Sequence, residues 1–165
     1  MSGLIALALS IGGLGAVATW LALGPLAGIV TIWAIFVAWG SYFHNGADQA
    51  SLKNTIVCGI FGSVMAGIAF ILISQVSLGE VFTAPVWVGL TVFVLVFASQ
   101  VPALSVIPTS VYGYAVTAAY LLHVGGDPLA VGLANPIVVI SLSLIAGAIF
   151  GMLSGKLSAI LTSSD

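Results

Sequence analysis

Long apolar segments alternate with short polar loops along almost the whole chain. The hydrocarbon core of a bilayer is about 30 Å thick, and a helix of about 20 residues crosses it. Divided at this length, the apolar segments predict six transmembrane helices. We expect them near Leu4 to Leu23, Leu26 to Phe43, Thr55 to Val76, Pro85 to Gln100, Thr109 to Leu122 and Asn135 to Leu157. The pattern predicts an all-α polytopic membrane protein in which residues 1–165 form a single transmembrane domain.

Composition agrees with this membrane interpretation. Apolar residues make up 61% of the chain and charged residues 4%, and the mean hydropathy is +1.32. Soluble domains carry about 25% charged residues, so we expect the lipid bilayer to be the main partner of this chain. With a net charge of −2 and only two basic residues, the chain lacks the positive charge that nucleic-acid binding requires. A single cysteine, Cys58, excludes a disulfide framework.

The two lysines predict the orientation. The first apolar segment starts at Gly3 with no basic residue before it, so we expect a retained span rather than a cleaved signal. In a six-span arrangement, Lys53 in the second loop and Lys156 at the end of the last span lie on the same side as both termini. Because positive residues stay in the cytoplasm, we expect both termini there.

A short polar motif, His-x-Gly-x-Asp followed by an asparagine, occurs twice. The matching positions are His44, Gly46, Asp48 and Asn54 in the first copy and His123, Gly125, Asp127 and Asn135 in the second. We interpret this as an internal repeat, with repeat one over about residues 1–80 and repeat two over about 81–165. Three spans per repeat would place the second copy upside down relative to the first, as in many transporters and channels.

Asn54 and Asn135 each stand before a predicted apolar helix, which is typical of helix caps. The functional alternative is that two inverted helices direct their positive N-terminal ends at a polar solute. The histidines and aspartates, His44, Asp48, His123 and Asp127, are expected to be turn residues at the water interface, with a proton-linked role as the alternative. Neither loop supplies three metal ligands, so we expect no metal site.

The segment before the fifth span is interrupted by prolines. Pro102 and Pro108 stand six residues apart, and Thr109 and Ser110 follow the second one. Proline removes a backbone donor and disfavours a continuous helix. Two interpretations stay open: a broken or re-entrant segment that lines a pathway, and an ordinary cytoplasmic loop that ends with Pro108 in the first turn of the next helix.

Small residues recur every four positions in the third and sixth predicted spans. Such a stripe lets two helices approach closely, so we interpret it as a packing surface. The positions are Gly59, Ser63 and Gly67 in the third span and Gly147, Gly151 and Gly155 in the sixth.

No predicted span carries an ionisable residue near its middle. Ion-coupled pumps usually keep such a residue within the membrane. A pathway of hydroxyl, amide and aromatic groups suits a small neutral solute better, and Trp33 and Tyr112 are candidates for a constriction. The chain has no paired carboxylates, no Ser/His/Asp spacing, no phosphate-binding loop and no HExxH motif, so we expect neither an enzyme nor a cofactor.

Three motifs carry a family resemblance. They are the second-span ending Trp39-Gly40-Ser41-Tyr42-Phe43, the stretch Ile107-Pro108-Thr109-Ser110-Val111-Tyr112-Gly113, and Gly147-Ala148-Ile149-Phe150-Gly151. With these motifs the chain resembles the YcdZ-like family of small bacterial inner-membrane proteins, which share a domain of unknown function. The resemblance covers most of the chain and implies an inner-membrane location and a compact multi-span fold.

Together these features favour a passive channel or facilitator for a small neutral solute of the urea, ammonia or short-amide class. A proton-coupled secondary transporter, with His44 or His123 in the pathway, is one alternative. An accessory or structural subunit without transport activity, which docks through its glycine stripes, is another. We also expect a homo-oligomer, since small channel proteins commonly assemble symmetrically.

Overall fold

The computed structural model describes residues 2–162, which fold into six α-helices joined by turns and two short 3-10 helices. The number of helices predicted from the apolar segments is therefore confirmed. The elements are α1 (Gly3–Leu23), α2 (Ile32–His44), α3 (Gln49–Gln75), α4 (Thr83–Phe97), η1 (Ala98–Gln100), η2 (Pro102–Leu104), α5 (Ile107–His123) and α6 (Pro136–Thr162).

The second helix is shorter than predicted. Gly24 and Pro25 end α1 as expected, but the turn continues through Gly28, which has a φ of 80°, and α2 begins only at Ile32. At 13 residues, α2 spans about 20 Å, less than a bilayer core of about 30 Å. Among residues 2–162, four segments are long and apolar enough to cross a membrane, namely α1, α3, Thr83–Gln100 and α6, whereas α2 and α5 are shorter, at 13 and 17 residues.

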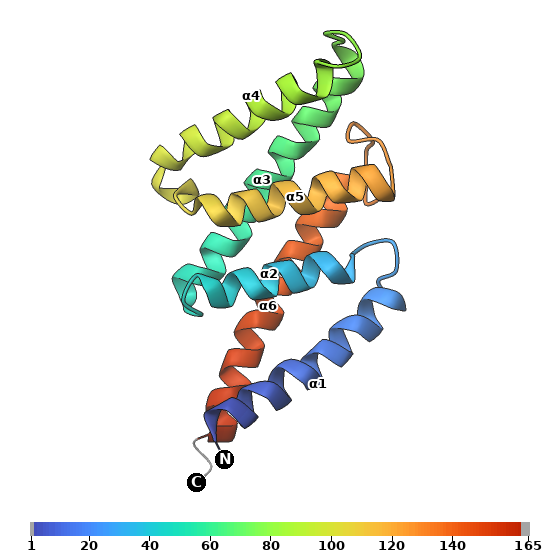
Figure 1. Ribbon diagram of the computed structural model, residues 1–165. Coiled ribbons are helices and arrows are strands. Elements are labelled where there is room, and N and C mark those ends of the chain that lie inside the picture. The colour runs from blue at the N-terminus through green and yellow to red at the C-terminus, as the bar shows by residue number, and fades with distance from the viewer. Residues whose placement is uncertain (1, 163–165) are drawn as a thin grey trace.

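The two longest helices, α3 and α6, run in opposite directions and pack side by side at the centre of the molecule (Figure 1). Helices α2 and α5 lie in front of them, with α2 packed on α6 and α5 packed on α3. The outer helices follow the same rule, since α1 packs on α6 and α4 packs on α3. The contacts of α1–α3 are thus matched one by one by the contacts of α4–α6.

Glycines lie where the central helices approach most closely. A Cβ on Gly62 of α3 would overlap the carbonyl of Ser110 in α5, and a Cβ on Gly113 would overlap the carbonyl of Gly59. In the other half, Gly147 of α6 lies in the same way against the carbonyl of Ile35 in α2. Only hydrogen at these positions allows the backbones of two helices to touch.

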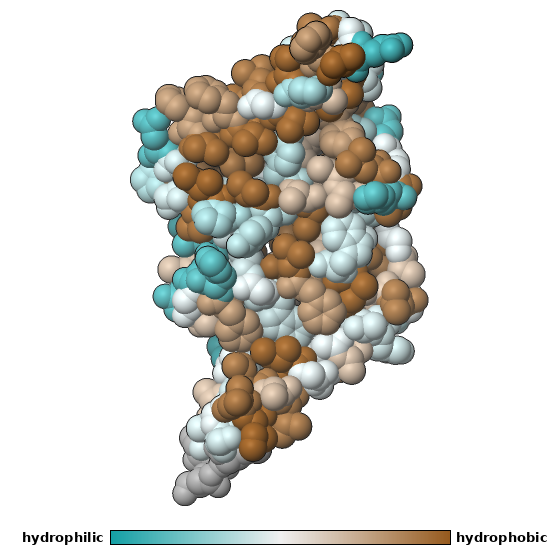
Figure 2. All heavy atoms as spheres, viewed as in Figure 1, coloured by the Kyte–Doolittle hydropathy of each residue, from teal (hydrophilic) through white to brown (hydrophobic). Residues whose placement is uncertain are grey.

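The buried core contains aliphatic side chains of α2, α4 and α6, while many large apolar side chains face outward. Ile35, Leu95, Ile140 and Leu144 are buried, whereas Phe93 is among the exposed aromatic residues. Figure 2 shows apolar residues spread over the face of the molecule and most of the strongly hydrophilic ones toward its left and right edges, where the helices end. An apolar surface with polar helix ends is the distribution that a bilayer requires.

The contact between α3 and α5 gives a stability prediction. Gly62→Ala should lower the free energy of unfolding by about 1–3 kcal/mol, because the added methyl group forces two backbones apart. Gly12→Ala is the matched control, since no atom lies within 4 Å of a Cβ there. Thermal unfolding in detergent, followed by circular dichroism, measures both variants. Equal stability of Gly62→Ala and Gly12→Ala would contradict the close approach.

Candidate functional site

A cluster of neutral polar side chains is buried where the end of α2 meets the beginnings of α3 and α5. The Asn45 side-chain amide donates to the hydroxyls of Thr109 (3.0 Å), Thr55 (3.3 Å) and Ser41 (3.4 Å). The hydroxyls of Ser41 and Thr109 are also hydrogen-bonded to each other, at 3.1 Å. The exposed fractions of Ser41, Thr55 and Thr109 are 3%, 1% and 2%. We call these four residues the Asn45 cluster.

The Asn45 cluster depends on the tight turn between α2 and α3. Asn45 ends α2, and Gly46 and Ala47 then take φ values of 114° and 60°, which reverse the chain. The Tyr42 hydroxyl donates to the Ala47 carbonyl at 2.7 Å and holds this turn. Asp48 caps α3, because its Oδ1 accepts from the Ser51 backbone N–H at 2.7 Å. The turn thus fixes the Asn45 amide against α5.

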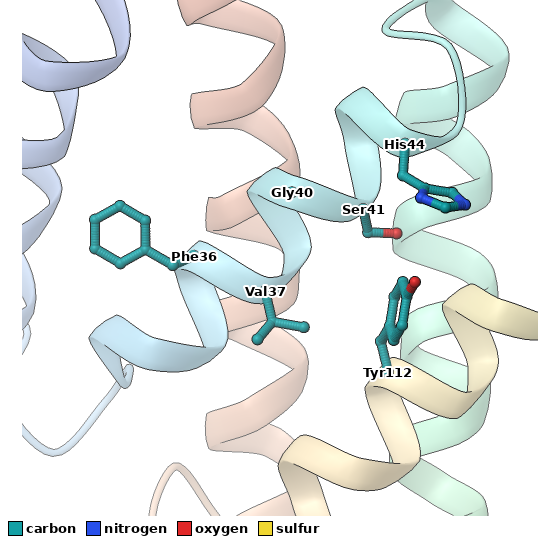
Figure 3. Close-up of a pocket in the computed structure, with 6 residues that line it drawn as sticks. All are labelled: Phe36, Val37, Gly40, Ser41, His44 and Tyr112. Carbon is teal, nitrogen blue, oxygen red and sulfur yellow. The ribbon is translucent and has the colours of Figure 1, made fainter.

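A pocket of about 310 Å³ adjoins this cluster between α2 and α5. Figure 3 shows His44 and Tyr112 facing each other across it, with the Ser41 hydroxyl directed toward the space between them. The two rings meet edge to face, with 6.4 Å between their centroids. Phe36, Val37 and Gly40 form the rest of the wall. Because Ser41 belongs to both the wall and the Asn45 cluster, the pocket connects to the buried polar groups.

Two buried hydroxyl oxygens, Thr31 Oγ1 and Ser110 Oγ, have no hydrogen-bond partner among residues 2–162. Thr31 stands directly before α2, and Ser110 lies in the first turns of α5. The same sequence interval separates Thr31 from Ser110 as separates His44 from His123. A buried hydroxyl without a partner loses the hydrogen bonds that water would offer, so each of these groups carries a desolvation cost.

The two predicted asparagine caps differ. Asn135 caps α6 as expected: its Oδ1 accepts from the Ile137 backbone N–H at 2.7 Å. Its amide also donates to the carbonyls of Pro128 and Ala130. The expected cap at Asn54 is wrong, because α3 begins at Gln49 with Asp48 as its cap, and Asn54 lies within the helix. The two helix beginnings lie on opposite sides of the molecule, left and right in Figure 1, so the two asparagines do not meet.

The proline segment connects α4 to α5 on the same side of the molecule as the α2–α3 turn, the left side in Figure 1. Pro102 opens η2, and Pro108 lies in the first turn of α5. Both prolines are exposed, whereas Thr109 is buried in the Asn45 cluster. The Cys58 thiol donates to the Ala103 carbonyl at 3.5 Å, which ties the connection to α3.

The other candidates are spread over the molecule. Trp33 is partly exposed at the start of α2 and is absent from the pocket that Tyr112 lines. His44 is the last residue of α2 and His123 the last residue of α5, and these helices end on opposite sides of the molecule (Figure 1). Asp127 accepts from the Leu129 backbone N–H in a loop turn. Within residues 2–162, no three His, Cys, Asp or Glu side chains come together as a metal site.

Most residues of the small stripes lie in contacts within the chain. Ser63 accepts a 2.7 Å hydrogen bond from Thr117 of α5, while Gly67 faces Ile137 and Gly151 faces the Tyr42 ring. Gly155 departs from the packing interpretation, because no atom lies within 4 Å of a Cβ at that position. It lines a groove instead.

Sequence reasoning missed Asn45, Ser41 and Thr55. The signal for Asn45 is the Asn45-Gly46 pair, which is typical of a turn. Ser41 and Thr55 flank this turn within apolar segments, where hydroxyl side chains need partners. The pairing of Asn45 and Ser41 with Thr109 requires the position of α5, which local sequence does not contain.

Comparison with known families assigns the chain to a protein family. The family described as "Protein of unknown function (DUF1097)" matches residues 8–159. The chain belongs to this family. The predicted resemblance to a domain-of-unknown-function family is thereby confirmed, and the Asn45 cluster and its pocket lie within the matched DUF1097 region. Searches of curated proteins and of solved structures found no match to this DUF1097 protein.

The Asp48 cap predicts a pH dependence of stability. Hydrogen bonds from the Ser51 hydroxyl and backbone N–H hold the pKa of the Asp48 carboxyl below its ordinary value. A lowered pKa in the folded state stabilises the fold fully above the ordinary aspartate pKa of about 3.9 and loses this effect as pH falls through the folded pKa. Asp48→Asn keeps a capping oxygen but does not titrate.

Wild type and Asp48→Asn should therefore have unfolding temperatures that converge as the pH is lowered from 7 to about 2.5. Circular dichroism in detergent measures this difference directly. A constant difference between the two proteins over that range would show that the Asp48 carboxylate does not contribute as a charged cap.

Proposed function

We propose that this DUF1097 protein is a passive facilitator for a small neutral solute across the bacterial inner membrane, with no catalytic step. Its two repeats, α1–α3 and α4–α6, are proposed to lie in the bilayer with inverted orientation. The matched contacts of α2 with α6 and of α5 with α3 support this arrangement. Three helices per repeat is an odd number of crossings, so the second repeat must enter the membrane from the opposite side.

The membrane orientation follows from the helix ends. In Figure 1 the beginning of α1, the α2–α3 turn, the α4–α5 connection and the end of α6 lie along the left side of the molecule. Lys53 near the start of α3 and Lys156 near the end of α6 belong to that side. By the positive-inside rule we propose that this side faces the cytoplasm, together with both termini.

The short length of α2 places irregular backbone within the proposed membrane region. Since α2 spans about 20 Å, part of the irregular segment 24–31 would lie at membrane depth. Irregular backbone survives there only where protein or water satisfies it. The Thr31 backbone N–H donates to the Ser143 hydroxyl at 2.9 Å, which satisfies one such group.

The Asn45 cluster beside the α2–α5 pocket is the observation that carries the proposal. All four members are uncharged, and their hydroxyls both donate and accept hydrogen bonds. The pocket wall holds no carboxylate, lysine or arginine that would retain a charged solute. Its volume of about 310 Å³ exceeds that of one water, about 30 Å³, by enough to admit urea or a short amide. Neutral groups replace the hydration of such a solute without trapping it.

Solute flux tests this proposal. In liposomes, stopped-flow light scattering should show urea or formamide flux above that of empty vesicles and independent of a proton gradient. Thr109→Val should lower this flux about tenfold, because Asn45 and Ser41 lose a hydrogen-bond partner. Thr19→Val is the matched control, since its hydroxyl bonds only to the Gly15 carbonyl within α1.

Ser41→Ala provides a second variant if Thr109→Val fails to fold. Equal flux in Thr109→Val, Ser41→Ala and wild type would exclude the cluster as the pathway. The absence of flux for every neutral solute would leave an accessory or structural subunit as the better function. We also propose that the protein forms a symmetric homo-oligomer, with its exposed apolar helices available for contact between subunits.

His44 supports a second candidate, proton-coupled transport, because its imidazole lines the same pocket as Ser41. For coupled transport, uptake of a solute should depend on an imposed pH gradient. His44→Gln should then abolish that dependence, whereas His123→Gln, on the opposite side of the molecule, should retain it. Wild-type flux that does not change with the gradient would exclude coupling.

A further inference from the structure

A second groove, separate from the α2–α5 pocket, lies between the α2–α3 turn and the C-terminal part of α6. Its volume is about 510 Å³, and Asp48 and Gln49 line it from the turn side. Gly155 and Lys156 line it from α6. No atom lies within 4 Å of a Cβ at Gly155, so the glycine leaves this groove open. We call it the Asp48 groove.

An apolar groove of about 300 Å³ lies on the other side of Lys156, between α1 and α6. Figure 1 shows this part of α6 running beside the beginning of α1, below the α2–α3 turn on the left side of the view. The lining side chains are Leu14, Leu153, Lys156, Leu157 and Ile160. Lys156 therefore joins a groove that contains charged side chains to an apolar one, as the boundary of a bilayer joins headgroups to acyl chains.

The Asp48 groove holds one side chain of each charge. The Ser51 hydroxyl and backbone N–H both donate to Oδ1 of the exposed Asp48 carboxylate. Among residues 2–162, Lys156 forms no ion pair with Asp48 within 4 Å. The groove thus offers a carboxylate oxygen and an ammonium group to separate parts of one ligand. A ligand of matching charge is a zwitterion with an apolar tail.

We propose that the two grooves together bind one phosphatidylethanolamine-type phospholipid. Its phosphate contacts Lys156, its primary ammonium donates to Asp48, and an acyl chain lies along Leu153 and Leu157. A primary ammonium donates hydrogen bonds to a carboxylate, whereas the quaternary ammonium of a choline lipid does not. An anionic glycerol lipid brings no cation for Asp48. The site requires that these helices lie in a bilayer, but it is independent of solute transport.

Native mass spectrometry of the purified full-length protein tests the site. Phosphatidylethanolamine should remain bound at one molecule per chain and about tenfold more tightly than phosphatidylcholine or phosphatidylglycerol of the same acyl chains. Lys156→Gln and Asp48→Asn should each remove this preference. Lys53→Gln is the matched control, because Lys53 is exposed on α3 and lines neither groove.

Gly155→Leu tests the same site without a change of charge. The larger side chain fills the Asp48 groove from a position with open space, so it should reduce lipid binding while the unfolding temperature is retained. Free phosphoethanolamine distinguishes a lipid from a soluble phosphate and should bind far more weakly than the lipid. Equal binding of all three lipids, an equal effect of Lys53→Gln and Lys156→Gln, or tight binding of free phosphoethanolamine would overturn the proposal.

Discussion

The close approach of helix backbones at Gly62, Gly113 and Gly147 is the constraint on which the rest of the structure depends. A serine or threonine hydroxyl reaches only a short distance from its own helix. Hydroxyls on two helices therefore bond to each other only where the backbones nearly touch, as in the 2.7 Å bond between Thr117 and Ser63. The same approach brings the start of α5 against α2 and α3, so the helix contact and the polar cluster have a common cause.

The two matched halves use this contact differently. Between α3 and α5, hydroxyl groups pair across the interface, whereas α2 meets α6 mainly through Ile35, Ala38 and the aromatic ring of Trp39. Polar contact is limited to the Trp39 indole N–H, which donates to the Ser154 hydroxyl at 3.0 Å, and to the Thr31 backbone N–H before α2, which donates to Ser143, among residues 2–162. One arrangement of helices thus carries both a polar interface and an apolar one. The buried polar groups of the Asn45 cluster lie where α5 contributes Thr109.

The apolar segments were enough to predict six helices, because burial of backbone groups in an apolar environment requires helices. They were not enough to predict the length of α2. Hydropathy does not register the φ of 80° at Gly28, which delays the helix to Ile32. The cap at Asn135 was predictable from Pro136 behind it, but Asn54 was not distinguishable from Asp48 by residue type alone.

The Asn45 cluster depends on the register of three helices that are distant in sequence, so no local motif predicts it. The cluster also has a property that its individual residues lack. The Asn45 amide has two hydrogens for three hydroxyl oxygens, so its hydrogen bonds are shared rather than fixed. In the proposed function, a guest beside Ser41 that offers its own donors would complete this set without leaving a buried group unpaired. The proposal draws on this property, because a purely structural network is stabilised most when every group already has its partner.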